Sequence, residues 1–145
     1  MALAIAVLPS CNPIDNPTQE EEQEYYTAKQ KEVLSIFHGS FSYTLYGTTT
    51  KISFSQPFSK PIEGKFSNGD KTEMHGKLTF HYWNGSSYDR YYRLHSDAKK
   101  IALYMVDEST KEIYKTELKD FQYVDSNTFK WKDTNDMVWD TYQRD

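Results

Sequence analysis

The side chains best suited to chemistry in this chain of 145 residues are four histidines, one cysteine and several neighbouring carboxylates. His75 and His81 lie six positions apart in the sequence. In a regular strand this spacing places both on one face and about 20 Å apart, too far to bind one metal ion together. We therefore expect these histidines to be polar side chains facing solvent, and we predict no metal site.

The neighbouring carboxylates predict turns rather than catalysis, because aspartate in a turn forms local hydrogen bonds. The pairs are Asp70 with Glu73, Asp107 with Glu108, and Asp133 with Asp136. The sequence has no phosphate-binding glycine loop, no nucleophile elbow and no zinc-protease motif. We expect a protein that is not an enzyme, has no catalytic residues and needs no cofactor.

Aromatic residues make up 16% of the chain. Alternation places Tyr82 on the inner face with Phe80, which leaves Trp83 on the outer face near a predicted hairpin tip, close to Tyr88. Trp and Tyr dominate the energetics of many interfaces, and an exposed Trp beside a Tyr can also stack on a sugar ring. Trp83 and Tyr88 are therefore candidate surface contacts. The alternative is that Trp83 covers a neighbouring strand or the helix.

A second aromatic set is expected inside the fold. Its members are Phe41, Tyr43, Phe54, Phe80, Met105, Phe129, Trp131 and Trp139. Small barrels either fill their interior with side chains or hold one small ligand. Bulky rings favour filling, whereas inward tyrosine hydroxyls favour a polar-lined pocket. Both alternatives stay open, and the candidate ligand-binding residues are Tyr43, Tyr82, Trp131 and Trp139.

The elements that position these side chains are one helix followed by strands. Thr18, with Glu21 three residues later, has capping-box spacing and predicts a helix over residues 18–37, which Gly39 then ends. From residue 39 onward, alternating apolar residues and turn signals predict strands. Their ranges are 39–47, 50–56, 61–67, 73–83, 87–95, 99–106, 111–124, 127–133 and 137–143.

Eight or nine sequential strands joined by tight turns predict an all-β antiparallel meander with one N-terminal helix. We expect the meander to close as a lipocalin-like up-and-down barrel, because closure protects the strand edges. A β-sandwich would show the same alternation and is the alternative. Residues 18–145 are predicted to form this single domain.

The net charge of −4 argues against a general nucleic-acid binder. All of the excess negative charge lies in residues 1–37. The chain begins with an apolar stretch that leads to Leu8-Pro9-Ser10-Cys11, the chain's only cysteine. Such a stretch is typical of a processing signal. These residues predict a signal remnant at 1–10 and an extended, proline-containing tether at 11–17.

Leu8-Pro9-Ser10-Cys11 resembles the lipobox of bacterial lipoproteins, with Leu three positions before Cys and a small residue directly before it. In that family the Cys carries the lipid anchor and becomes the first residue of the mature chain. The resemblance implies lipid modification of Cys11 and attachment to the bacterial cell envelope, in the outer membrane, on its periplasmic or its exposed side.

The lipobox, tether, short helix and meander together resemble the lipocalin-like small lipoproteins of Gram-negative envelopes. The closing strands carry Phe-Lys-Trp-Lys at 129–132 and Val-Trp-Asp-Thr-Tyr-Gln-Arg at 138–144, while Phe41 stands where lipocalins have the Trp of Gly-x-Trp. The resemblance implies non-catalytic binding of a small, lipophilic ligand. One alternative is an interaction module that binds protein or glycan through exposed aromatics. Another is a small hydrolase or inhibitor.

Overall fold

The structure is a computed structural model, and it describes residues 24–145. Cys11, the tether and the predicted helix cap at Thr18 lie outside the described residues. Within them, helix α2 (Ala28–Leu34) precedes ten strands. The strands are β1 (Gly39–Leu45), β2 (Thr48–Phe54), β3 (Ile62–Phe66), β4 (Lys71–Met74), β5 (Gly76–His81), β6 (Ser87–Leu94), β7 (Lys100–Asp107), β8 (Glu112–Asp125), β9 (Thr128–Asp133) and β10 (Asp140–Arg144).

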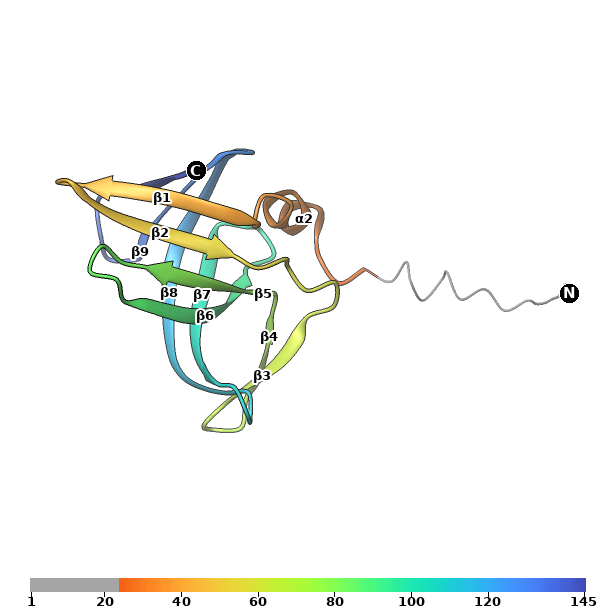
Figure 1. The fold of residues 1–145 in the computed structure, drawn as a ribbon. Helices are drawn as coiled ribbons and strands as arrows, with labels where there is room; N and C mark the ends of the chain where they lie inside the picture. The colour runs from red at the N-terminus through yellow and green to blue at the C-terminus, as the bar shows by residue number, and fades with distance from the viewer. Residues whose placement is uncertain (1–23) are drawn as a thin grey trace, which may run out of the picture.

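Eight of these strands close into an antiparallel barrel (Figure 1). Going round the barrel, the order is β1, β2, β5, β6, β7, β8, β9 and β10. β10 pairs with β1 through Phe41 and Arg144, which closes the ring. This confirms the predicted up-and-down barrel and excludes the β-sandwich. Hairpin β3–β4 lies outside the ring, where β3 pairs in parallel with β8 through Lys65 and Glu112.

The predicted strand 73–83 is two strands, because the chain breaks at His75. The backbone N–H of His75 donates to the carbonyl of Tyr92 at 2.7 Å, while the His75 carbonyl accepts from the N–H of Phe58 at 2.8 Å. His75 is only 1% exposed. The expectation that it faces solvent is therefore wrong. The break lets the chain leave hairpin β3–β4 and enter the barrel.

The helix is shorter than predicted, because residues 24–27 are not helical. Thr27 is the N-cap: its hydroxyl accepts from the N–H of Gln30 at 3.1 Å, and the Gln30 amide oxygen accepts from the N–H of Thr27 at 2.7 Å. This capping box starts α2 at Ala28. The helix ends at Leu34, and Gly39, with φ of 71°, begins β1 instead of ending the helix.

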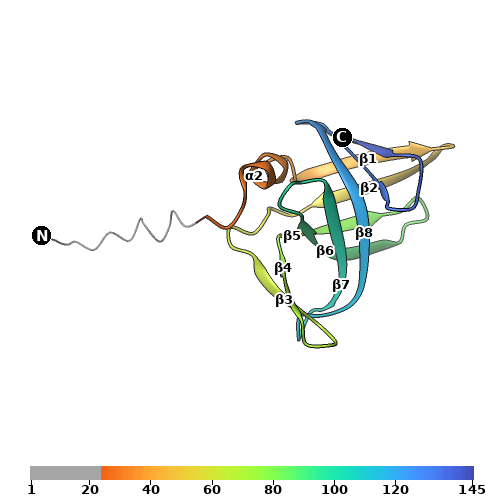
Figure 2. The ribbon, with the colours of Figure 1, turned by 180° about the vertical axis from the view of Figure 1, so that it is seen from behind.

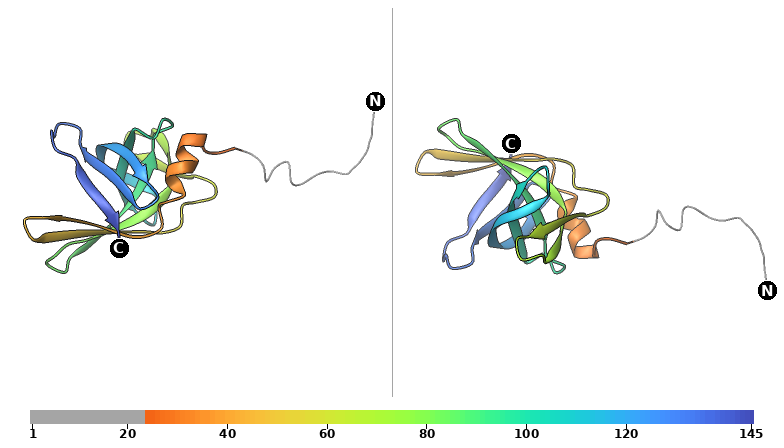
Figure 3. Two further views of the ribbon diagram at one scale, coloured as in Figure 1. Left: turned by 90° about the horizontal axis from the view of Figure 1, so that it is seen from above. Right: turned by 90° about the horizontal axis from the view of Figure 1, so that it is seen from below.

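Phe37, just beyond α2, enters the barrel and fills one end of it. Its ring is fully buried and stacks on Phe54 at 4.3 Å. Figures 2 and 3 show α2 lying across this end. The interior behind it is packed with side chains. The buried aromatic rings in it are Phe37, Phe41, Phe54, Phe80, Tyr92, Phe121, Phe129, Trp131 and Tyr142.

Two residues predicted for the interior lie elsewhere. Met105 is only half-buried and does not belong to this cluster. Trp139 is half-buried and precedes β10 in the loop that follows β9.

Candidate ligand-binding site

A small pocket of about 220 Å³ opens at the barrel end opposite α2. Side chains from nearly every barrel strand meet there. They are Tyr43, Thr50, Phe80, Tyr82, Arg90, Glu117, Lys119, Trp131, Asp140 and Tyr142. The pocket thus brings together Tyr43, Tyr82 and Trp131, three of the four residues predicted from the sequence to bind a ligand.

Aromatic rings form the wall of this mouth pocket. Tyr82 stacks on Phe80 with centroids 6.0 Å apart and planes 9° apart. The ring of Tyr142 lies 5.4 Å from those of both Trp131 and Tyr43. Because the rings pack against one another, they present an ordered surface on which a flat or ring-shaped molecule can lie.

Two cations line the same pocket. Lys119 Nζ lies 2.7 Å from a carboxylate oxygen of Asp133 and 5.5 Å from the ring centroid of Trp131. Arg90 donates from Nη1 to the carbonyl of Asp89 at 2.8 Å. Its buried Nε has no hydrogen-bond partner among residues 24–145. A buried donor left unpaired costs free energy, which a ligand acceptor would recover.

Two carboxylates balance these cations. Asp140 accepts a hydrogen bond from Tyr43, and burial first, then this bond, raise the pKa of Tyr43. Glu117 supplies the second carboxylate of the lining. The pocket therefore carries opposite charges in equal number, beside aromatic rings. Such a set can bind a hydroxylated or zwitterionic molecule.

These four charged residues were not among the residues predicted from the sequence. The signal for two of them was alternation: Arg90 stands two positions before Tyr92, and Lys119 two before Phe121, both interior aromatics. A period of two therefore turns the charged side chains inward. The interior predicted from the sequence contained only apolar and aromatic residues. That prediction therefore missed charged side chains that face inward at the open end of the barrel, where water solvates them.

Trp139 does not join the mouth pocket. It lines a separate groove of about 640 Å³, together with Leu45 and Val138. This groove forms because β1 pairs with β10 only at its first half, through Phe41 and Ser42, which leaves the β1 tip separated from β10.

The predicted surface aromatics are exposed. Trp83 is 74% exposed at the turn between β5 and β6, and Tyr88 is 49% exposed. Tyr88 packs its ring against Tyr82 at 5.6 Å. Because Trp83 is so exposed and lies at the end opposite α2, it covers neither a neighbouring strand nor the helix.

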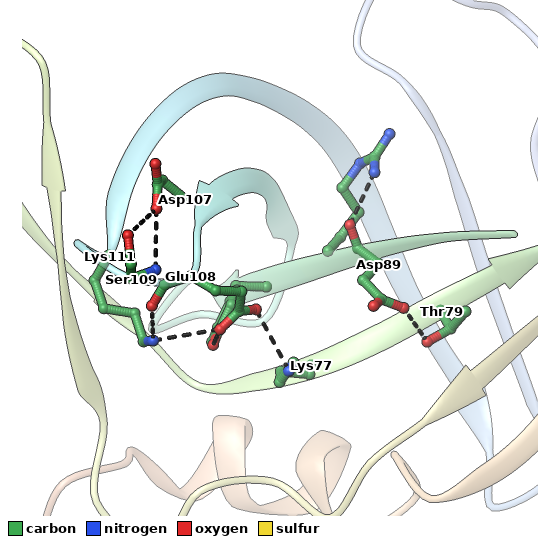
Figure 4. A network of polar contacts seen from close by, with 9 residues as sticks. Lys77, Thr79, Asp89, Asp107, Glu108, Ser109 and Lys111 are labelled. Carbon is green, nitrogen blue, oxygen red and sulfur yellow. Dashed lines mark hydrogen bonds and ion pairs between the residues drawn. The ribbon is translucent and has the colours of Figure 1, made fainter.

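The carboxylate pair at 107–108 is engaged in local structure (Figure 4). Asp107 accepts from the N–H of Ser109 at 3.0 Å and from its hydroxyl at 2.7 Å, which lowers the Asp107 pKa. Glu108 accepts from the Tyr91 hydroxyl at 2.8 Å and lies 3.5 Å from Lys77. The hydrogen bond from Tyr91 is the main cause of the lowered Glu108 pKa. Both are ordinary ionised turn residues.

Among residues 24–145, no three His, Cys, Asp or Glu side chains converge on a position that could hold a metal ion. In the same part of the chain, no helix has the length and apolar character needed to cross a bilayer. Comparisons with models of protein families, with curated proteins and with solved structures found no match to this chain.

Proposed function

We propose that this protein is a non-catalytic binding protein whose barrel mouth binds one small, polar, ring-containing molecule. The observation that carries the proposal is the mouth pocket itself. It combines a wall of aromatic rings with the cations Arg90 and Lys119 and the carboxylates Glu117 and Asp140. Sites of this kind use apolar surface for contact and a few placed polar groups for orientation.

The size of the pocket favours a small ligand. A volume of about 220 Å³ equals roughly seven water molecules. The rest of the barrel interior is occupied by packed rings, among them Phe37 and Phe129. A long acyl chain would have to displace them. The sequence expectation of a lipophilic ligand stays a prediction, and the lining favours a molecule with a polar edge, such as a monosaccharide or a zwitterionic amino acid.

Each part of the pocket has a role in this proposal. The ligand ring lies against Trp131 and Tyr82. Arg90 and Lys119 donate to its oxygens, and the carboxylate of Asp140 accepts from its hydroxyl or ammonium group. Because the charges of the lining cancel, the pocket does not select for strong net charge.

The position of the protein in the cell is a second part of the proposal. The lipobox-like segment ending at Cys11 supports attachment to the bacterial envelope through a lipid. Several acyl chains on one cysteine would give the stable anchoring that one chain does not. If the parent chain and Cys11→Ser differ in mass only by the substituted side-chain atom, no lipid is attached to Cys11 and the anchor is absent.

The binding proposal is tested by titrating the full chain with panels of monosaccharides and amino acids while following thermal unfolding. A ligand that binds the folded state raises the melting temperature. We expect Arg90→Gln and Lys119→Gln to remove that rise. The matched control is Lys130→Gln, since Lys130 alternates with Phe129 and Trp131 and so faces outward. A rise of equal size in all three variants would place binding elsewhere.

A further inference from the structure

Three loops at the barrel end opposite α2 carry large exposed apolar side chains at their tips. Tyr46 is 95% exposed in the β1–β2 turn, Trp83 74% in the β5–β6 turn, and Met137 and Val138 are 92% and 72% exposed in the β9–β10 loop. Figure 3 shows all three loops projecting in one direction, away from α2. We call Tyr46, Trp83, Met137 and Val138 the apolar crown.

The loops of the crown are neighbours in space. β2 pairs with β5, with Lys51 opposite His81, so the β1–β2 and β5–β6 hairpins lie side by side. On the other side, Leu45 and Val138 line the same groove, which joins the β1–β2 hairpin to the β9–β10 loop. The exposed side chains thus belong to one end of the molecule. Scattered single apolar residues on a surface need no explanation, but a group gathered at one end marks an interaction site.

The charge of this end indicates a neutral partner. Residues 43–50 and 82–88, which form the two hairpin tips, contain no Lys or Arg and no acid. The mouth pocket between the loops has balanced charge, and the third loop, residues 134–139, contains Asp136 and no Lys or Arg. These loops therefore provide no electrostatic attraction to an anionic surface. Trp and Tyr are the residues enriched where a bilayer meets water.

The shape of the crown favours a deformable partner over a rigid one. Its apolar side chains stand on separate projecting turns, which do not form one flat surface for a rigid protein partner. A glycan is also a poor partner, because the exposed aliphatic groups of Met137 and Val138 offer a sugar no hydrogen bond. Part of the backbone at the β5–β6 tip is paired within the turn: the N–H of Gly85 donates to the carbonyl of Tyr82 at 3.0 Å, and the N–H of Tyr82 donates to the carbonyl of Ser86 at 2.9 Å. Such a tip can enter a less polar medium without leaving these groups unpaired.

We propose that the apolar crown docks into the interfacial layer of a zwitterionic lipid bilayer. Tyr46, Trp83 and Met137 insert their side chains among the headgroups, while the carboxylate of Asp136 in the third loop stays in water. The crown residues surround the mouth pocket but do not line it, and docking does not depend on a ligand there. It also lies at the opposite end of the barrel from the point where α2 begins.

The experiment uses the full chain carrying Cys11→Ser, so that no lipid anchor contributes, and vesicles of phosphatidylcholine. We expect the protein to float with the vesicles and its tryptophan emission to shift to the blue. Trp83→Ser should lower the partition coefficient about tenfold or more, as expected for one buried aromatic side chain. Tyr46→Ser and Met137→Ser should also lower it. The matched control is Tyr114→Ser, since Tyr114 is 71% exposed on β8, away from the crown.

Several outcomes would overturn the proposal. These are no flotation of the parent chain, an equal loss for Tyr114→Ser and Trp83→Ser, or binding only to phosphatidylglycerol vesicles that salt abolishes. Concentration-dependent dimers that Trp83→Ser weakens, without vesicle binding, would assign the crown to a second copy of the chain. Ligand titration without vesicles measures binding in the mouth pocket alone. Failure of the ligand-binding proposal can therefore be distinguished from failure of the bilayer-docking proposal.

Discussion

The Nδ1 atom of the His75 imidazole accepts a hydrogen bond of 3.0 Å from the backbone N–H of Leu94, 19 residues further along the chain. The Tyr26 ring packs edge-on against this imidazole at 5.1 Å. Because Nδ1 is an acceptor, the folded protein holds His75 neutral, with its proton on Nε2. This contact fixes the point where hairpin β3–β4 joins the barrel.

The stability of the fold should therefore fall as the solution becomes acidic. Burial, helped by the nearby Arg93, lowers the pKa of His75 from 6.5 to about 4. Between these values the unfolded chain binds a proton that the folded chain does not, so protonation favours unfolding. The stabilisation is complete above pH 6.5 and is lost as the pH falls to about 4. We expect His75 alone to contribute on the order of 3 kcal/mol to this decrease, as measured by urea unfolding at several pH values.

A variant separates this contribution from that of other groups. His75→Asn keeps an acceptor oxygen near the N–H of Leu94 but cannot titrate. Its unfolding free energy should be lower at pH 7, because it loses the contact with Tyr26, yet should change less between pH 6.5 and 4. His81→Asn, at an exposed position, is the control and should keep the full dependence. An unchanged slope in His75→Asn would contradict the assignment.

Phe37 should be the most sensitive position near the helix. Its ring is buried against those of Phe54, Phe121 and Phe129 at centroid distances of 4.3, 5.8 and 5.9 Å. Phe37→Ala removes the packing between α2 and the barrel and should cost about 3–5 kcal/mol in denaturant unfolding. Leu118→Ala, at a site 41% exposed, should stay within about 0.5 kcal/mol. Similar losses in the two variants would show that Phe37 does not close the barrel end.

Arg144 holds the C-terminus to two other parts of the chain. Its Nη1 donates to the carbonyl of His38 at 2.7 Å, and its Nη2 to those of Ile36 and Ser126 at 3.0 and 2.9 Å. A lysine cannot reproduce this planar set of donors. Arg144→Lys should lower the unfolding free energy by about 1–3 kcal/mol, whereas Gln143→Ala, at the exposed neighbour, should change it little. Full stability in Arg144→Lys would refute this role.

The hydroxyl of Tyr92 is buried and has no hydrogen-bond partner among residues 24–145. Removing an unpaired buried polar group relieves its desolvation cost. Tyr92→Phe should therefore be as stable as the parent or up to about 1 kcal/mol more stable in chemical denaturation. Tyr91→Phe is the matched comparison and should lose about 1 kcal/mol, because the Tyr91 hydroxyl donates to Glu108. A loss above that size for Tyr92→Phe would show that its hydroxyl is paired.

The strand pattern could be predicted because alternation is a local property. Phe41, Phe54 and Phe129 belong to the buried interior cluster, as their period of two requires. Closure into a barrel depends on the pairings of β10 with β1 and of β8 with β9, which alternation does not distinguish from a β-sandwich. The break at His75 could not be predicted, because it depends on contacts with Tyr92 and Leu94 from another strand.

The candidate site was predictable only in part. Tyr43, Tyr82 and Trp131 share the inner face and meet at the mouth, as alternation indicates. Trp139 does not, because it precedes β10 in a loop whose path no local pattern fixes. The sequence does not distinguish the capping-box spacing at residues 18–21, which lies outside the described residues, from that at 27–30, which starts α2.

Native mass spectrometry of the gently purified full chain tests the central claim most directly, namely that the barrel mouth binds one small polar molecule. The protein is measured after exposure to the monosaccharide and amino-acid panels, beside the double variant Arg90→Gln/Lys119→Gln. The account predicts a single added small mass on the parent chain that denaturation releases and the double variant lacks. An unmodified mass after every exposure, or equal loading of both proteins, would contradict it.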